Sequence, residues 1–438
     1  MPVEPNISSH SQSLQRRIGL AGATAFGLGA ILGTGVFVSV VTATQQHGST
    51  VLVGIALAAL AAVCNGLSSA QLAAAFPVSG GTYEYAYRVL NPWLGFTAGW
   101  LFLCAKCASA AAAALGAASY VQLWLPHTAH SRTAQIPAVL IAVMILICVG
   151  LITLSGIRWA NGFNFVLVAV SLSSLAFFVG EVTLSQEPSK VQIVSSSTLS
   201  VWGTLQAAAI MFVAFTGYGR IATLGEEVQD PSRTIPRAVI VTLIFTGGVY
   251  LCVALATLRL LSLSESPTPA RNLLELASPH ASCLAIVWLT VGALAAMLAV
   301  ENNLILGLSR VVLAMGRRGD LPARFGQLNQ RNSSPTAALI LVVTSIGLVI
   351  VMSDFKIAWE FSALTVLVYY GITNFCALRL DKSQRMFPAW VSILGGMLTF
   401  GLALFIQPKV WGVVVALLLL GWCVRGLFRN SRFFGNSV

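Results

Sequence analysis

The chain has 438 residues, of which 57% are hydrophobic and only 9% are charged, a composition unlike that of a water-soluble globular domain. Apolar blocks of about 20 residues recur along the whole sequence, and each is long enough to cross the hydrocarbon core of a bilayer. The lipid bilayer is therefore the expected main solvent. The formal net charge of +11 comes from basic residues spread over many loops, which argues against a nucleic-acid partner.

Twelve membrane-spanning helices are predicted. The first apolar block follows Arg16 and Arg17 and has no small-residue cleavage site after it, so we expect a retained helix and not a cleaved signal peptide. In chain order, the predicted helices cover residues 18–42, 50–75, 93–124, 135–154, 162–181, 201–225, 238–260, 283–314, 336–352, 358–378, 388–407 and 410–427.

Basic residues are unevenly divided between the two sets of alternate loops. Seventeen of the 25 Lys and Arg residues fall on the side of the N-terminus and six on the opposite side, while Lys106 and Arg220 lie at membrane depth. Because cytoplasmic loops carry an excess of Lys and Arg, we predict a multi-pass protein of the plasma (inner) membrane with both termini in the cytoplasm. The loops around Glu84, Asp230 and Gly319 are expected on that same side.

Cysteine and histidine give no sign of a metal or redox site. The eight cysteines lie within or at the ends of apolar blocks, and the five histidines lie in tails, loops or helix ends without metal-ligand spacing. We expect no metal and no cofactor. An enzyme is not expected either, because intramembrane His clusters, paired carboxylates or a Ser-Lys dyad are not found, and a channel would need repeated pore-lining rings.

Glycine interrupts two of the predicted helices. The first helix contains GAILGTG at residues 29–35, and the sixth contains FTGYG at residues 215–219. Unwound backbone at membrane depth is tolerated only where it is buried in protein or lines a cavity. Each break falls in the first helix of a five-helix unit, which predicts an inverted-repeat transporter with its site between the repeats. The alternative is that these glycines only allow close helix packing.

Broken helices have a polarity that suits a particular kind of ligand. One end of the break exposes backbone N–H groups with the positive end of the helix dipole, and the other exposes free carbonyls. The first suits a carboxylate and the second an ammonium group. Because an amino-acid zwitterion carries both, a small-molecule amino acid is the expected substrate.

Four segments, in order along the chain, resemble the amino-acid/polyamine/organocation (APC) family of permeases. Residues 76–85, continuing to Gly95 and Trp100, are the most specific match, to the family's loop between helices two and three. The four segments are GAILGTGVF at 29–37, FPVSGGTYEY at 76–85, GEEVQDPSRTIPR at 225–237 and SRVVLAMGRRGDLP at 309–322.

The resemblance implies a secondary active transporter that works by alternating access, on an all-α membrane fold with a 5+5 inverted-repeat core. The first repeat would cover residues 18–181 and the second residues 201–380, followed by two peripheral helices at 388–427. Residues 1–17 and 428–438 would be cytoplasmic tails.

The same resemblance implies a substrate site at the two breaks. Backbone N–H groups of residues 33–35 would bind the carboxylate, and carbonyls near residues 31, 213 and 216 would bind the ammonium. Phe212 and Phe215 would form an aromatic gate, although Phe side chains facing lipid are the ordinary alternative. The implied site residues are Ile31, Gly33, Thr34, Gly35, Phe212, Val213, Phe215, Thr216 and Gly217.

Three positions depart from related permeases. Gly219 stands where many cationic-amino-acid members have Asp, and residues 163–178 contain no Lys of the kind that some proton-coupled relatives place in helix five. Ala299 stands where sodium-coupled relatives would have a hydroxyl ligand. The coupling ion is left open between H+, sodium and none, as are exchange and the oligomeric state. A non-transporting amino-acid sensor and a permease for polyamines or other organic cations are the alternatives.

Two charged residues lie near the middle of predicted helices. Lys106 is in helix three and Glu301 in helix eight, where a bare charge costs at least about 2.5–3.5 kcal/mol. We expect both to avoid lipid. They could form a static salt bridge or a proton relay, or Glu301 could meet a cationic substrate.

Overall fold

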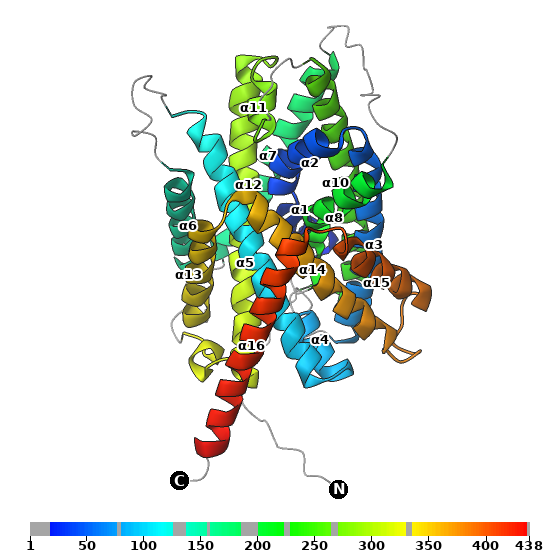
Figure 1. Ribbon diagram of the computed structural model, residues 1–438, viewed down its shortest axis with the longest axis vertical. Helices are drawn as coiled ribbons and strands as arrows, with labels where there is room; N and C mark the ends of the chain where they lie inside the picture. The colour runs from blue at the N-terminus through cyan, green and yellow to red at the C-terminus, as the bar shows by residue number, and fades with distance from the viewer. Residues whose placement is uncertain are drawn as a thin grey trace.

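The computed structural model describes residues 18–76, 80–125, 137–155, 158–184, 200–222, 228–263, 270–329 and 335–435. The described part of the chain is a bundle of α-helices (Figure 1). Its only β-type pairing is a single parallel bridge between Ile18 and Val228. The expected tail at residues 1–17 and part of the segment at 225–237 lie outside the described residues.

The helices follow the predicted order. Their bounds are α1 Leu20–Ile31, α2 Val40–His47, α3 Thr50–Ala75, α4 Thr82–Val89, α5 Pro92–Gln122, α6 Ala138–Ser155, α7 Arg158–Leu184, α8 Val201–Phe215, α9 Gly219–Ala222, α10 Pro231–Leu263, α11 Leu273–Ala277, α12 Cys283–Arg318, α13 Thr336–Met352, α14 Phe355–Leu378, α15 Ala389–Ala403 and α16 Pro408–Gly435. Three short turns depart from the α-helix: the π-helical turn η1 Gly35–Ser39 and the 3-10 turns η2 Thr216–Tyr218 and η3 Ala323–Gly326.

An apolar helix lies within each of the twelve predicted crossings, and eight or nine of these helices have spanning length. In the described ranges, eight helices are long and apolar enough to span a bilayer, and the bent pair Leu20–Ile31 and Gly35–His47 makes a ninth. Shorter apolar helices at Ala138–Leu154, Thr336–Met352 and Ala389–Ala403 cover the remaining three. The prediction of an all-α integral membrane protein is confirmed. The division into repeats at 18–181 and 201–380 stays a prediction.

Several helix ends differ from the predicted ones. Helix α10 begins at Pro231, seven residues before the predicted 238, because proline is well tolerated in the first turn of a helix. Helix α12 continues to Arg318 and ends at Gly319, whose φ of +83° is readily adopted only by glycine. The predicted tail at 428–438 is helical as far as Gly435.

Both predicted helix breaks are present. The first predicted helix bends by 41° between Ile31 and Gly35. The sixth ends as an α-helix at Phe215 and continues through the 3-10 turn η2 into α9. The break in the first helix is confirmed, and in the sixth a 3-10 turn interrupts the α-helix within one span, Val201–Ile221.

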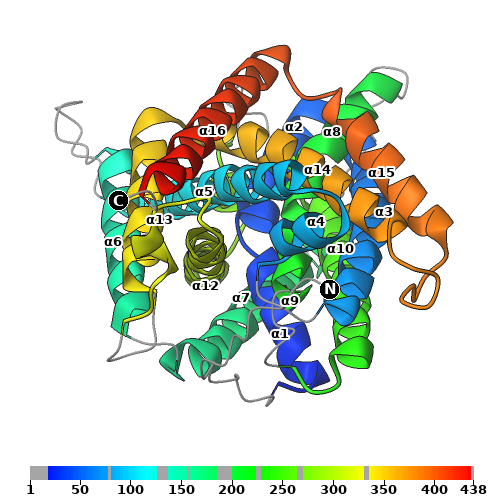
Figure 2. The same ribbon diagram turned by 90° about the horizontal axis from the view of Figure 1, so that it is seen from below.

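The core of the bundle is organised around α5. This helix runs through the middle of the bundle in the view of Figure 2, with α6 and α13 on one side and α3, α10 and α15 on the other. It packs against both α12 and α14, whereas α16 lies at the periphery. The helix that carries Lys106 is thus the most enclosed of the spans.

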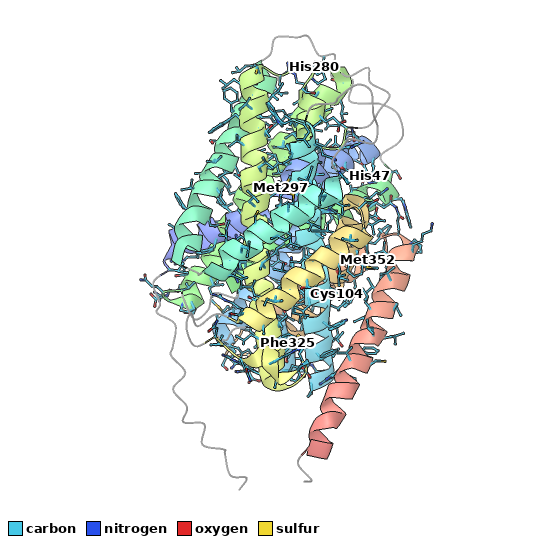
Figure 3. All side chains as sticks on the ribbon, turned by 90° about the vertical axis from the view of Figure 1, so that its left-hand side faces the viewer. His47, Cys104, His280, Met297, Phe325 and Met352 are labelled. Carbon is cyan, nitrogen blue, oxygen red and sulfur yellow. The ribbon has the colours of Figure 1, made fainter. Side chains whose placement is uncertain are left out.

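The bundle has two distinct ends. One end holds α4, η3 and the end of α16, and the other holds α11 (Figure 1). Phe325 of η3 and His280 after α11 mark these opposite ends in Figure 3. We call them the α4 end and the α11 end. Glu84 of α4 and the end of α12 before Gly319, which were expected on one side, both lie at the α4 end, because Arg318 bonds to Glu84.

Candidate functional site

The two helix breaks meet backbone to backbone. A Cβ added at Gly217 of η2 would overlap the carbonyl group of Ala30 in α1. Only glycine permits an approach this close, because any side chain at this position would displace one of the two broken helices. The glycine at position 217 therefore joins the first and sixth helices at their breaks.

The unwound turn at residues 33–35 is enclosed by two helices. An added Cβ at Gly33 would lie 2.6 Å from Val300 Cγ2 of α12, and one at Gly35 would lie 2.7 Å from Ala214 Cβ of α8. Thr34 between them is buried. Within the described part of the chain, none of the backbone N–H groups of these three residues donates a hydrogen bond. The expected carboxylate donors are thus free in this conformation.

The expected carbonyl acceptors already have hydrogen-bond donors nearby. The Tyr250 hydroxyl lies 3.0 Å from the Ile31 carbonyl oxygen and 2.8 Å from that of Ala214, so it links the two broken helices. Thr216 Oγ1 donates to the Val213 carbonyl at 2.8 Å.

The Thr216 carbonyl has a hydrogen-bond donor from α14, since the Tyr370 hydroxyl donates to it at 3.2 Å. A carbonyl oxygen accepts two hydrogen bonds. The Val213 carbonyl accepts from both the Oγ1 and the backbone N–H of Thr216, so the carbonyls of Ile31 and Thr216 are the better candidates for an ammonium group. Sequence reasoning missed Tyr250 and Tyr370. The available signal was a phenol in an apolar helix, which needs a polar partner when buried.

The two candidate gate residues are inside the protein. Phe212 packs edge-on against Tyr370 with ring centroids 5.9 Å apart, and Phe215 packs against Tyr250 at 5.0 Å. Both Phe side chains are fully buried. The alternative that they face lipid is wrong, and their role as a gate stays a prediction.

Lys106 and Glu301 are both buried, and the structure does not bring them together. Lys106 Nζ donates to Thr216 Oγ1 at 2.9 Å, so the lysine reaches the break of the sixth helix. Neither carboxyl oxygen of Glu301 has a hydrogen-bond partner among the described residues. The anticipated salt bridge is absent from this conformation because Lys106 bonds to η2, whereas Glu301 follows Val300, which packs against the break of the first helix.

Because Lys106 and Glu301 make no contact, the result of a double-mutant cycle can be predicted. Because the two side chains do not interact, the effects of Lys106→Met and Glu301→Gln on thermal stability should add to within about 0.5 kcal/mol. The measurement is thermal unfolding of the two single variants and the double variant in detergent. A double variant clearly more stable than the sum of the single effects would show that the residues form a pair.

A bidentate ion pair joins the loop segments at the α4 end. Arg318 at the end of α12 donates from Nε to Glu84 Oε1 at 2.7 Å and from Nη2 to Glu84 Oε2 at 2.5 Å. Its guanidinium also lies over the Tyr87 ring, 4.6 Å from the centroid. Two of the family-like segments, at 76–85 and 309–322, are thus bonded to each other.

A second, buried network at the same end includes the peripheral helix α16. Asp320 accepts from Arg425 Nε at 3.1 Å and from the Tyr83 hydroxyl at 2.9 Å, and the Tyr87 hydroxyl also donates to it. Burial, followed by the Asp320 carboxylate, raises the pKa of the Tyr83 phenol far above its ordinary value, so this phenol stays a donor. Sequence reasoning used Arg425 only as a topological charge.

At the α11 end, a small, partly open recess lies over the outer halves of the broken helices. Ser39 and Thr42 line it from η1 and α2, Ile210 lines it from α8, and Trp359 and Glu360 line it from α14. The elements that carry the two breaks therefore also form the wall of an opening toward this end.

Comparisons with known proteins agree with this geometry. The Amino acid permease family matches residues 22–426. The chain is 38% identical over 393 residues to an uncharacterized transporter of Mycobacterium tuberculosis, covering 87% of this chain and 85% of that protein. It is 26% identical over 344 residues to the branched-chain amino acid permease BcaP of Bacillus subtilis (76% and 73% covered). It is 25% identical over 393 residues to human cationic amino acid transporter 4 (86% and 62% covered).

Apolar spans arranged around two backbone breaks that meet inside the bundle define a polytopic membrane transporter, and the similar proteins are transporters rather than enzymes. The family match covers nearly the whole chain. The chain belongs to the amino acid permease family, which confirms the resemblance of its four segments.

Proposed function

We propose that the protein is a secondary active amino-acid transporter that works by alternating access, with the substrate held at the two breaks. The observation that carries the proposal is the buried turn at residues 33–35, whose three N–H groups make no hydrogen bond within the described chain. Such groups at a helix break suit a carboxylate, and the nearby carbonyls of Ile31 and Thr216 suit an ammonium. An α-amino acid presents both groups at one carbon atom.

The surroundings of Gly219 support a substrate without a cationic side chain. An added Cβ there would lie 2.6 Å from the Tyr370 hydroxyl, so this site has no room for the Asp that many cationic members have. We therefore favour neutral amino acids over polyamines and other organic cations. The similar proteins include both a branched-chain permease and a cationic amino acid transporter, so the choice rests on the surroundings of Gly219.

Flux measurements separate a transporter from a non-transporting sensor on the same fold. A thermal-shift screen of the proteinogenic amino acids on purified protein identifies ligands, and counterflow into proteoliposomes then tests transport. We expect a ligand that stabilises the protein to accumulate in preloaded vesicles. Binding without any flux would support the sensor, and absence of both would contradict the proposal. Proton symport and exchange are both compatible with the site.

We propose that the protein lies in the plasma membrane with the α4 end and both termini in the cytoplasm. The reason is that seventeen Lys and Arg residues are assigned to that side and six to the other. In a cysteine-free background, a membrane-impermeant maleimide should label Ser232→Cys only after permeabilisation. His280→Cys, at the α11 end, is the matched control and should react in intact cells. Labelling of Ser232→Cys from outside would reverse the orientation.

A further inference from the structure

Glu301 lies in the middle of α12, next to the break in the first helix. The preceding residue, Val300, is the one that a Cβ at Gly33 would touch. One helical turn before Glu301, Met297 packs with Thr34 around Gly116 of α5. Met297 is in the interior of the bundle in Figure 3. The carboxyl group therefore belongs to the part of α12 that encloses the proposed carboxylate-binding turn.

The polar residues that follow Glu301 on α12 are paired, whereas Glu301 is not. Asn302 Oδ1 accepts from Thr153 Oγ1 at 2.9 Å, and Asn303 Nδ2 donates to Asn164 Oδ1 at 2.9 Å. Glu301 is 1% exposed, and both of its carboxyl oxygens lack a hydrogen-bond partner in the described part of the chain. Since buried polar groups are normally satisfied, this exception calls for a functional explanation.

Few ionisable groups face Glu301 from the elements that pack against α12, which are α1, α5, α6, α7, α11, α13 and η3. Helices α1 and α13 carry none. The weakly acidic groups of α5 and α6 are Cys104, Cys107, Tyr120 and Cys148. Arg158 and Glu181 are near the ends of α7, and Glu275 and Arg324 belong to α11 and η3 at the two ends of the bundle.

Two cations are closer to the middle of the bundle. Arg220 of α9 approaches α12 at Gly307, which is six residues, or roughly 9 Å along the helix axis, beyond Glu301. Lys106 donates to Thr216. Neither forms an ion pair with Glu301. An ionised carboxylate in this position would lack both water and a counter-charge, at a cost of several kcal/mol, and the neutral acid avoids that cost.

We propose that Glu301 carries the coupling proton of transport, bound as the carboxylic acid in this conformation. One proton binds to a carboxylate oxygen from water on one side of the membrane. The same proton leaves to water on the other side when the cycle exposes the group. No other bond forms or breaks. The inference rests on the proposed function, because a coupling proton has meaning only if the substrate is transported.

Proteoliposomes containing wild type or Glu301→Gln separate coupling from transport. The probe is a tritiated mixture of the proteinogenic amino acids, followed in counterflow and in uphill uptake driven by an inside-alkaline pH gradient. Glutamine has the shape of the protonated acid but cannot release a proton. We expect counterflow within about twofold of wild type and at least a tenfold loss of accumulation driven by the pH gradient.

A control variant and the behaviour of the wild type distinguish failure of the Glu301 assignment from failure of the proposed function. Glu275→Gln, in α11 at the end of the bundle, is the matched control and should keep uphill uptake. Wild type without counterflow would sink the proposed function itself. If the wild type shows counterflow but its uphill uptake is driven by a sodium gradient or by no gradient, only the assignment of Glu301 is overturned. Uphill uptake by Glu301→Gln would overturn the same assignment.

A measurement on the wild-type protein covers the case in which Glu301→Gln does not fold. Dicyclohexylcarbodiimide reacts with protonated carboxyl groups in apolar surroundings. We expect mass spectrometry to find the adduct on the peptide containing Glu301 at neutral pH, with no adduct at Glu275. An unmodified Glu301 peptide under conditions of active transport would contradict the proposal.

Discussion

Gly33→Val and Gly35→Val should each lower amino-acid uptake at least about 100-fold while the protein still inserts into the membrane. A valine at Gly33 would collide with Val300, and one at Gly35 with Ala214, so the turn could not keep its N–H groups aimed at the substrate. A hydrogen bond to a charged group contributes about 1.5–3 kcal/mol, and loss of two such bonds corresponds to that reduction. Initial rates of uptake into proteoliposomes provide the measurement.

The control for this prediction is a glycine with open space around it. An added Cβ at Gly248, in α10, meets no atom within 4 Å, so Gly248→Val should transport like wild type. Methyl esters and decarboxylated analogues of the substrate should compete at least about tenfold more weakly than the amino acid, because they lack the carboxylate. Strong competition by an ester would refute the role of residues 33–35 in carboxylate binding.

Asp320→Asn should destabilise the protein by about 3–5 kcal/mol, because it leaves the Arg425 guanidinium buried without its counter-charge. Both side chains are almost completely buried, at 3% and 7% exposure, so water cannot replace the lost partner. The double variant Asp320→Asn with Arg425→Met should recover part of the loss, since it removes both charges. Thermal unfolding in detergent, followed by tryptophan fluorescence or light scattering, measures the effect.

A nearby exposed pair provides the matched control. Arg88 lies 3.9 Å from Glu84 with its side chain 42% exposed, and exposed pairs of this kind contribute about 1 kcal/mol or less. Arg88→Gln should therefore leave stability nearly unchanged. If Asp320→Asn were no more harmful than Arg88→Gln, the network would not stabilise the α4 end.

The position of this network has a consequence for the transport cycle. Its members come from α4, from the segment after α12 and from α16, so it ties the two predicted repeats to a peripheral helix. Alternating access requires one repeat to move against the other. In the proposed alternating-access cycle, these bonds either break or move as a unit when the path toward the α4 end opens.

The sequence by itself determined the membrane class, the order of the helices and the positions of both breaks. Hydrocarbon cannot hydrogen-bond to a peptide group, so apolar blocks of spanning length must form helices wherever they face lipid. Glycine at residues 33, 35 and 217 further indicated where the helices would be interrupted. These are local properties of the chain, and they can be recognised from spacing and residue type.

Only the tertiary structure decided which side chains meet. Lys106 and Thr216 are 110 positions apart, and Asp320 and Arg425 are 105 apart. An apolar helix embedded among other helices has little amphipathic pattern, so its sequence does not fix the rotation that aims one side chain at a partner. For that reason Lys106 could not be assigned to η2 rather than to Glu301 in advance. The roles of Tyr250, Tyr370 and Arg425 likewise follow from how the helices pack.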